Sequence, residues 1–346
     1  RSGARERRQD AGAHRVERGS GDGRVVDDVE IERRCGDGHG AILSFDKLVC
    51  QLSGHYRGAV LPVLHVGCPM WAHRPWTGRF LPSNTPSGRE LHAYSRFVNA
   101  VEGNTTFYAS PSRSTVAKWA EQAHPGFRFV FKVPRTITHE LRLRDADGEI
   151  AGFVELMSPL GDLIGGMTLQ LPASFAPVDL GGLESQIRRL PSGIAWSVEV
   201  RHPAFFEGPP RQALDRMLAR NEVERVLLDS RTLFRQPPRT DAGRETWSRK
   251  PRVPALTEAL TDRPVVRFIG SDDPDLTVEG LQEWQPIVAH WLSEGRAPTF
   301  FVHTPDNADS PGLARAFHAE VSLLVPELAP LPDPLPIEQA EQGSLF

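Results

Sequence analysis

Cysteine and long apolar runs are scarce in this sequence of 346 residues, and each scarcity excludes a class of protein. The three cysteines, Cys35, Cys50 and Cys68, are far apart and form no CxxC pair. We therefore expect neither a disulfide framework nor a zinc site, and a reducing cytoplasm is the expected compartment. No apolar run reaches the roughly 18 residues that a membrane-spanning helix needs, so no membrane partner is expected.

Charge bias and the common cofactor motifs are also missing. The formal net charge of -4 argues against global electrostatic binding to nucleic acid, although it leaves a local basic pocket open. No GxGxxG follows the first predicted strand, so a dinucleotide-binding fold lacks its phosphate fingerprint. There is no HExxH or GxSxG motif either. No cofactor is predicted, and a divalent metal remains an open alternative.

Both ends of the chain differ in composition from its middle. Residues 1–60 mix Arg, Gly, Asp and Glu with few large apolar side chains at their start, which is typical of a disordered, low-complexity extension. Residues 327–346 are rich in Pro, Glu and Gln and predict a short disordered tail. Between them, residues 62–326 predict a single folded domain.

That domain alternates short apolar runs with amphipathic helical stretches. The expected strands are Pro62–Cys68, Phe97–Glu102, Phe127–Val133, Gly166–Leu171, Ile194–Val200, Val223–Asp229, Pro264–Ile269 and Pro298–His303. The expected helices are Arg89–Arg96, Ser114–Ala123, Leu180–Leu190, Pro210–Asn221, Thr277–Glu294 and Gly312–Leu324. Strand–helix alternation implies parallel strands, and eight units predict a single α/β (β/α)₈ barrel of the TIM type, with an open doubly wound sheet as the alternative. Leu233–Leu256 is a long Pro/Arg-rich insertion that we interpret either as a lid or as a solvated excursion.

Ionisable side chains end nearly every predicted strand. Because barrel active sites lie at the carboxyl ends of the strands, these residues predict a polar pocket there. The expected catalytic residues are Glu102, Lys132, His139, Glu199 and Asp229, and the expected substrate-binding residues are Trp71, Asn104, Tyr108, Arg135, Arg201, His202, Arg267, His303 and Asn307. Arg and Lys outnumber the carboxylates, which favours an anionic ligand such as a phosphate or carboxylate. The alternative is a set of structural ion pairs between strands.

The aromatic residues and the histidines of this rim each allow two interpretations. Trp71, Trp76 and Tyr108 would stack on a ring or base, or else pack in the core, with Trp76 the better candidate for packing. Histidines and carboxylates at the rim could form a metal site, but no tight ligand spacing is present and nearby cations oppose it. We therefore predict no bound metal.

The rim residues lie within stretches that resemble a known family. These stretches are VGCPMW, FVNAVEGNTTFYASPS, FRFVFKVPRTITH, LQLP, VEVRHPAFF, LLDSR, VVRFIG and FVHTPDN. They resemble the YecE-like family, the domain of unknown function 72, over about residues 62–325. The resemblance implies a TIM barrel and a pocket formed by Glu102, Asn104, Tyr108, Lys132, His139, Glu199, Arg201, His202, Asp229 and Arg267. The family's activity is not established.

Three departures from the family pattern indicate a subfamily with an HTPDN motif. Gly103 stands where Ile is commoner, Cys68–Trp71 replaces a Ser-Gly-Trp segment, and HTPDN replaces an asparagine-rich FNND motif. Because of these departures, the resemblance does not imply a shared substrate.

The last five residues, QGSLF, resemble the Gln-x-x-Leu-Phe peptide that binds the bacterial sliding clamp. Gln342, Leu345 and Phe346 would be the contact residues, and chance occurrence is the alternative.

Three functions therefore remain open from sequence. The first is a hydrolase for a phosphorylated or nucleic-acid substrate, with Glu199 or Glu102 as base, His139 or His303 as acid, and Arg201, Arg267 and Lys132 stabilising negative charge. The second is a non-catalytic DNA-maintenance accessory recruited to the clamp. The third is a sensor barrel that binds a small anion.

Overall fold

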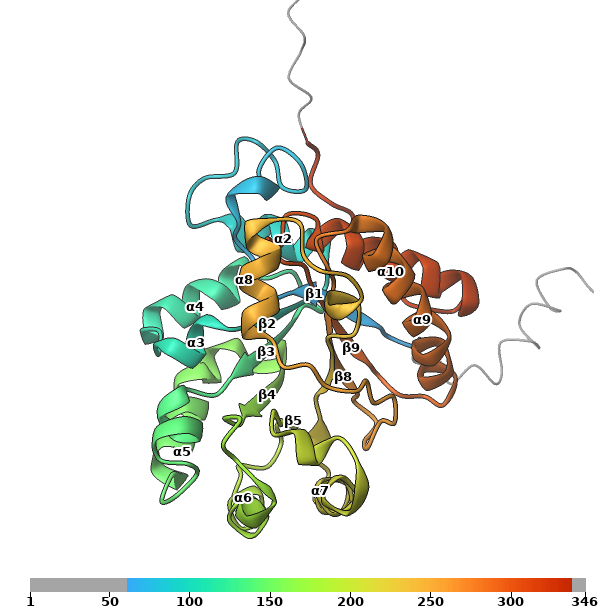
Figure 1. The fold of residues 1–346 in the computed structure, drawn as a ribbon. Coiled ribbons are helices and arrows are strands. Elements are labelled where there is room, and N and C mark those ends of the chain that lie inside the picture. The colour runs from blue at the N-terminus through green and yellow to red at the C-terminus, as the bar shows by residue number, and fades with distance from the viewer. Residues whose placement is uncertain (1–60, 338–346) are drawn as a thin grey trace, which may run out of the picture. The chain divides into compact units, whose positions relative to one another are not determined.

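Helices surround a parallel β-barrel in this chain, and the computed structural model describes residues 61–337 (Figure 1). The strands are β1 (His65–Cys68), β2 (Ala100–Gly103), β3 (Arg128–Lys132), β4 (Ile164–Gln170), β5 (Trp196–Glu199), β6 (Glu224–Arg225), β7 (Leu227–Asp229), β8 (Val265–Ile269) and β9 (Thr299–His303). Their order is β6-β5-β4-β3-β2-β1-β9-β8-β7, and every pairing is parallel. The predicted TIM-type barrel is confirmed.

The sixth predicted strand is divided into β6 and β7, so the expectation of one unbroken strand is wrong. Glu224 in β6 pairs with β5, whereas Leu227 in β7 pairs with β8. Between them, the Val226 N–H donates to the Val198 carbonyl oxygen at 2.9 Å. Barrel strands are tilted and staggered, so this segment changes its neighbour as it crosses the wall. The nine strands therefore correspond to the eight strand positions of the barrel, because β6 and β7 together occupy one of them.

Six helices overlap the predicted ones. They are α2 (Glu90–Phe97), α4 (Arg113–Gln122), α6 (Leu180–Ile187), α7 (Gly208–Arg220), α9 (Pro274–Ser293) and α10 (Ser310–Leu324). Helix α9 begins three residues before its predicted start because Asp273 Oδ1 accepts the backbone N–H groups of Asp275 and Leu276. None of the helices within residues 61–337 is long and apolar enough to cross a bilayer.

Three further helices were not expected from the sequence: α3 (Thr105–Tyr108), α5 (Asp147–Met157) and α8 (Asp241–Arg249). Helix α5 contains Gly148 and Gly152, which weaken helix propensity. It forms because Ile150, Phe153 and Met157 share one buried face. Burial therefore overrides the local preference. Short turns complete the chain, namely the 3-10 segments Arg74–Trp76, Ser158–Leu163, Pro177–Asp179, Pro203–Phe205 and Thr232–Phe234 and the π-helical turn Thr136–Glu140.

Strand alternation separates the apolar interior of the barrel from its polar end. Ala100, Val130 and Phe301 form a small buried cluster with Val265, apart from the main core between strands and helices. Two residues further along each of these strands, side chains of the same inward parity are polar. The interior is therefore plugged by apolar side chains beneath a polar mouth.

The insertion after β7 is anchored to the barrel, so a purely solvated excursion is not what forms. Thr240 Oγ1 accepts the Gly243 N–H at the start of α8. Val253 and Leu256 are buried in the main core. The backbone N–H groups of Arg239 and Thr240 also donate to Asp272, which comes after β8. The segment therefore packs against the carboxyl end of the barrel, where Figure 1 draws α8 in front of the strands.

Candidate functional site

Six inward-facing polar side chains meet at the carboxyl ends of the strands. They are Glu102 (β2), Lys132 (β3), Gln170 (β4), Glu199 (β5), Arg267 (β8) and His303 (β9), and all six are buried. Each comes two positions after an inward apolar or small residue, so the strand pleat places them in one layer. We call these six residues the mouth cluster.

Arg267 is the centre of the mouth cluster because it binds both carboxylates. Its Nη1 donates to Glu199 Oε2 at 2.8 Å, and its Nη2 donates to Glu102 Oε2 at 3.1 Å. Lys132 Nζ lies 3.7 Å from Glu102 Oε1 and 3.6 Å from Glu199 Oε2. Buried charges need such partners, because an unpaired charge in the interior is costly. The structural ion pairs that the sequence left open are therefore part of the site.

Arg201 joins the mouth cluster from just beyond β5. Its Nε and Nη2 both lie 3.0 Å from Glu199 Oε1, and Nη2 also donates to Gln170 at 3.0 Å. Gln170 additionally accepts from Lys132 Nζ at 2.8 Å. The Arg201 side chain is 26% exposed, whereas Glu199 is fully buried. Arg201 Nη1 has no partner within residues 61–337, which leaves donors for a ligand at the mouth.

The two carboxylates are held in their ionised form. Burial opposes ionisation of Glu102 and Glu199, but Arg267 and Lys132 more than offset it and keep both pKa values well below the usual range. Burial lowers the pKa of Lys132, and Arg267 adds to the effect. Burial and Arg267 also lower the pKa of His303 to about 3, so this imidazole is neutral near pH 7. Its Nε2 lies 3.4 Å from Glu102 Oε2.

The sequence analysis missed two site residues, Gln170 of the mouth cluster and Lys250. Lys250 comes directly after α8 in the insertion and is partly buried, and its amine makes no hydrogen bond or ion pair with residues 61–337. Burial, and then the charges of Arg267 and Lys132, lower its pKa to about 7. Lys250 does not follow a predicted strand, so the strand-end pattern could not identify it. The one sequence feature that pointed to it was its place in the long basic insertion.

Two predicted residues, Asn104 and His139, lie beside the mouth cluster. Asn104 Nδ2 donates to Glu102 Oε2 at 2.7 Å and to the Pro69 carbonyl at 2.9 Å. His139 is half-buried against Phe107, and burial, with a smaller contribution from the nearby Arg201, lowers its pKa. Tyr108 and Arg135 are largely exposed and form no hydrogen bond or ion pair with the mouth cluster among the described residues; Arg135 pairs with Glu140 instead.

Other predicted residues make structural contacts. Asp229 is buried, but it accepts hydrogen bonds from Arg231 and from Trp284 of α9, rather than from the mouth cluster. His202 Nδ1 accepts the Ala204 N–H at 3.2 Å and caps the turn Pro203–Phe205.

The two tryptophans after β1 pack as core residues. Trp76 is fully buried, stacks on Tyr94, and donates from Nε1 to the Asn307 carbonyl at 2.8 Å. Trp71 is half-buried and meets Trp119 edge to face at 5.1 Å. Asn307 Oδ1 accepts the Thr304 N–H at 3.2 Å within the loop after β9.

Two expectations concern features beyond these contacts. Gln342, Leu345 and Phe346 lie outside the described residues. Within residues 61–337, no three His, Cys, Asp or Glu side chains converge as metal ligands would. Within the mouth cluster the two cations balance the two carboxylates, and Arg201 beside it adds a third cation, so the mouth as a whole has an excess of one positive charge and suits an anion.

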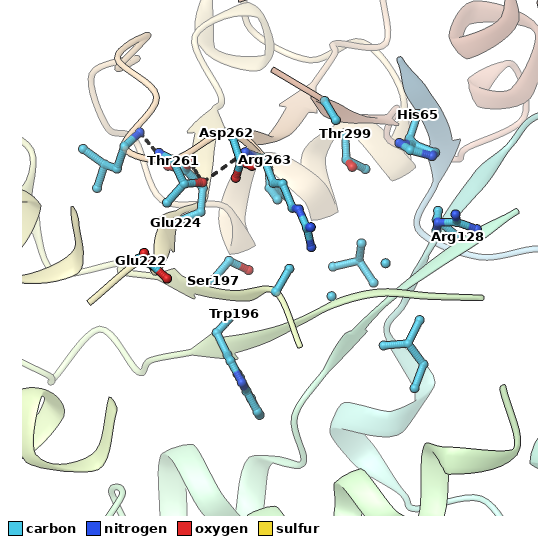
Figure 2. Close-up of a pocket in the computed structure, with 18 of the residues that line it drawn as sticks. His65, Arg128, Trp196, Ser197, Glu222, Glu224, Thr261, Asp262, Arg263 and Thr299 are labelled. Carbon is cyan, nitrogen blue, oxygen red and sulfur yellow. Dashed lines mark hydrogen bonds between the residues drawn. The ribbon is translucent and has the colours of Figure 1, made fainter. Parts of the chain in front are cut away.

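A separate cavity of about 540 Å³ lies at the opposite end of the barrel, where the strands begin (Figure 2). It is lined by residues such as His65, Arg128 and Thr299, whereas the mouth cluster sits at the other ends of the strands. Barrel chemistry is found at the carboxyl ends of strands, so we assign the candidate active site to the mouth cluster despite the size of this cavity.

Comparison with known proteins places the chain in a family. The family model described as "Protein of unknown function DUF72" matches residues 65–337. The UPF0759 protein YecE of Escherichia coli K12 is 39% identical over 285 residues, covering 82% of this chain and 100% of the relative. The same-named protein of E. coli O157:H7 is 38% identical over 285 residues, with the same coverage.

Two solved structures share the fold. A DUF72 family protein of Enterococcus faecalis V583 has a TM-score of 0.58 at 17% identity, covering 80% of this chain and 99% of that one. A DUF72 family protein of Thermotoga maritima MSB8 has a TM-score of 0.57 at 19% identity, covering 76% and 99%. The resemblance seen in the sequence motifs is confirmed, and the chain belongs to the DUF72 family.

Proposed function

We propose that the mouth cluster binds an anionic, phosphorylated substrate and that the protein hydrolyses its phosphoester bond. The observation that carries this is the charge balance of the mouth. Three cations, Lys132, Arg201 and Arg267, surround two carboxylates, and Lys250 adds an amine with no carboxylate partner within residues 61–337. Such an excess in a partly desolvated site attracts phosphate or carboxylate oxygens.

The two carboxylates serve this site by holding its cations. Glu102 and Glu199 have pKa values well below their usual range because Arg267 and Lys132 pair with them, so they accept a proton poorly near pH 7. We therefore assign them a positioning role in place of the general-base role that the sequence suggested. Arg201, whose guanidinium is partly exposed, is the anchor for the substrate oxyanion.

Lys250 is the group best suited to move a proton. Its pKa of about 7 lets the amine exist in both forms at neutral pH. In the proposed hydrolysis, a water oxygen attacks phosphorus while its proton passes to the neutral Lys250 amine. The phosphorus–oxygen bond to the leaving group then breaks, and the leaving oxygen takes a proton from the Lys250 ammonium. Arg201 and Arg267 stabilise the negative charge that develops.

A thermal-shift screen of the full chain tests binding first. The panel contains nucleotides, sugar phosphates, short single-stranded DNA and carboxylates, each with and without Mn²⁺ or Zn²⁺. A ligand at a hundred times its dissociation constant should stabilise the fold by roughly 2.7 kcal/mol. We expect a shift with phosphorylated compounds that Arg201→Ala removes and that Lys118→Ala, at an exposed position of α4, retains. No shift with any anion would contradict the proposal.

Release of inorganic phosphate from the stabilising compound then tests catalysis. Lys250→Met should lower kcat by about 10² or more, because general acid–base catalysis contributes about that factor. Stable binding without released phosphate would leave the sensor barrel as the function of the mouth. Absence of both would favour the accessory that binds the sliding clamp through Gln342, Leu345 and Phe346.

A further inference from the structure

The cavity where the strands begin has walls from both the barrel and the loop before β8. His65, Arg128 and Thr299 contribute from β1, β3 and β9, and residues 260–263 contribute from the loop. Its volume of about 540 Å³ falls within the roughly 300–1,000 Å³ typical of small-molecule sites. The Ala100, Val130 and Phe301 cluster lies between this cavity and the mouth cluster, so the two are separate sites.

Small residues make this end of the barrel hollow. Gly165, Gly166, Ala195 and Ala297 line the cavity, where larger side chains would fill it. A Cβ at Gly166 would lie 2.9 Å from the Ala195 carbonyl oxygen, and one at Gly165 would lie 2.9 Å from the Arg128 Cβ. Backbone approach therefore keeps β4 free of side chains here, and the space is a property of the fold.

Two guanidinium groups in the cavity lack a carboxylate partner. Figure 2 shows Arg263 extending towards the middle of the pocket and Arg128 lying beside His65. Among residues 61–337, no carboxylate lies within ion-pairing distance of either guanidinium. By contrast, Arg113, Arg142, Arg189 and Arg220 each form an ion pair with a carboxylate. The side chain of Arg128 donates one hydrogen bond, from Nη1 to the Phe127 carbonyl at 3.1 Å. Both groups therefore retain donors for a ligand.

The buried carboxylate of the cavity is engaged elsewhere. Glu224 accepts from the backbone N–H of Leu260 at 3.1 Å, from the N–H and Oγ1 of Thr261 at 2.9 and 2.8 Å, and from the Arg225 N–H at 2.9 Å. It holds the loop against β6. Glu222 and Asp262 also line the cavity, at exposed positions, and neither forms an ion pair with Arg128 or Arg263 among the described residues. Figure 2 draws the contacts of Glu224 on the opposite side of the pocket from Arg128 and His65.

His65 lies on the same side of the cavity as Arg128 and adds a neutral hydrogen-bond donor there. Burial, with a contribution from Arg128, lowers its pKa to about 4, so its imidazole is uncharged near pH 7. A neutral imidazole carries one N–H, which can donate to an oxyanion beside a guanidinium. Val130, Ile164 and Val265 provide apolar wall for the remainder of a ligand.

We propose that this cavity is a second binding site, independent of the mouth cluster, for a small organic oxyanion held by Arg128, Arg263 and His65. The charged end of the ligand, a carboxylate or a phosphate, lies between the two guanidinium groups, which suit such oxygens in bidentate geometry. Its carbon skeleton lies against the apolar wall.

Calorimetric titration of the full chain with succinate and, separately, glycerol phosphate tests this site and distinguishes the two anion chemistries. Arg263→Ala should weaken the binding of the preferred probe by about tenfold, because a charge-assisted hydrogen bond is lost. Arg216→Ala, at an exposed position of α7 outside the lining, is the matched control and should leave affinity unchanged. Because the mouth is itself proposed to bind phosphorylated compounds, the titrations are repeated in Arg201→Ala, which removes that binding, and the binding that depends on Arg263 should persist there.

Substitution of His65 locates the bound probe. His65→Leu should weaken binding of the probe as Arg263→Ala does, because the imidazole donor that lines the cavity is lost. If Arg263→Ala alters the melting temperature, Arg263→Gln provides the same test with most of the side-chain length preserved. The proposal is overturned if neither probe binds at millimolar concentration, or if Arg201→Ala abolishes binding while Arg263→Gln does not. Binding that Arg201→Ala abolishes would place the probe at the mouth and leave the proposed function standing.

Discussion

Arg267 and Glu199 lie 68 positions apart in the chain, yet Nη1 of one and Oε2 of the other are 2.8 Å apart inside the barrel. They come from β8 and β5, so their contact spans the interior and is not a pairing between neighbouring strands. Each is almost fully buried. The polar mouth therefore contributes to the cohesion of the barrel as well as to its chemistry.

Replacing Glu199 with Gln should destabilise the protein strongly. The amide would leave Arg267, Lys132 and Arg201 with one carboxylate fewer, and a buried ion pair that loses one partner typically costs about 3–5 kcal/mol. Urea denaturation, read as a change in the midpoint at constant m-value, measures this. Glu155→Gln removes an exposed ion pair with Arg113 and should cost at most about 1 kcal/mol. Equal midpoints for the two variants would contradict the structural role of Glu199.

Anion binding at the mouth should weaken as the pH rises above neutrality. Lys250 has a pKa of about 7, so the free protein loses this positive charge at higher pH, whereas a bound anion favours the charged amine. The affinity for a phosphodiester or carboxylate, whose own charge is constant, should fall by up to about tenfold per pH unit above the pKa of the free protein. Calorimetry in buffers from about pH 6 to about pH 9 checks it. In Lys250→Met, affinity should be lower at acid pH and the pH dependence should be lost; a persisting slope would assign it to another group.

Gly103→Ile should destabilise this chain, although the family pattern described above has Ile more often at this position. A Cβ at Gly103 would lie 2.4 Å from Phe131 Cδ1, inside the buried aromatic stack of Phe131 with Phe129 and Trp119. Overpacking of this kind costs about 1–3 kcal/mol. Combining the change with Phe131→Leu should recover part of that loss, with a coupling of about 1 kcal/mol in thermal or chemical denaturation.

Gly148→Ala provides the control for that experiment. A Cβ there meets no atom within 4 Å, and the position lies in helix α5, so stability should stay constant or rise slightly. If Gly103→Ile were equally benign, the contact with Phe131 would not be the reason for glycine at this position.

If the chain binds the bacterial sliding clamp, deleting residues 342–346 should abolish that binding while leaving the melting temperature unchanged. The segment resembles a clamp-binding peptide at Gln342, Leu345 and Phe346, and such peptides bind grooves through a few anchor side chains. Fluorescence anisotropy of the labelled full chain against purified clamp measures the loss. A double substitution, Leu345→Ala with Phe346→Ala, should match the deletion, and absence of binding by the parent chain would refute the motif.

Strand pleat is the reason that the mouth cluster could be predicted from sequence. Glu102, Lys132, Glu199 and His303 end apolar runs and Arg267 lies within one, and parallel strands bring these positions together irrespective of sequence separation. The same logic failed for Asp229. It ends β7 as predicted, but it contacts Trp284 of α9, because it shares the outward parity of Arg225, which pairs with Asp215 of α7, and not the inward parity of Glu224.

Long-range packing explains why other parts of the site could not be predicted. Lys250 lies near the mouth because α8 and the segment after it pack against the barrel, and its altered pKa arises from burial and from charges on other strands. No local pattern encodes that environment. The cavity where the strands begin could not be predicted either. Glycine and alanine within a strand indicate a weak β-strand propensity, and they do not indicate an enclosed space.

The divided sixth strand gives the barrel wall a seam. Two registered residue pairs join β6 to β5 and three join β7 to β8, while Val226 alone links the two halves. Glu224, below the seam, holds the loop of the lower cavity, and Asp229, above it, leads into the insertion that carries Lys250. Residues 224–229 therefore contribute to the lower cavity at one end and lead towards Lys250 at the other, so one short segment of the wall is shared by two regions that have no side chain in common.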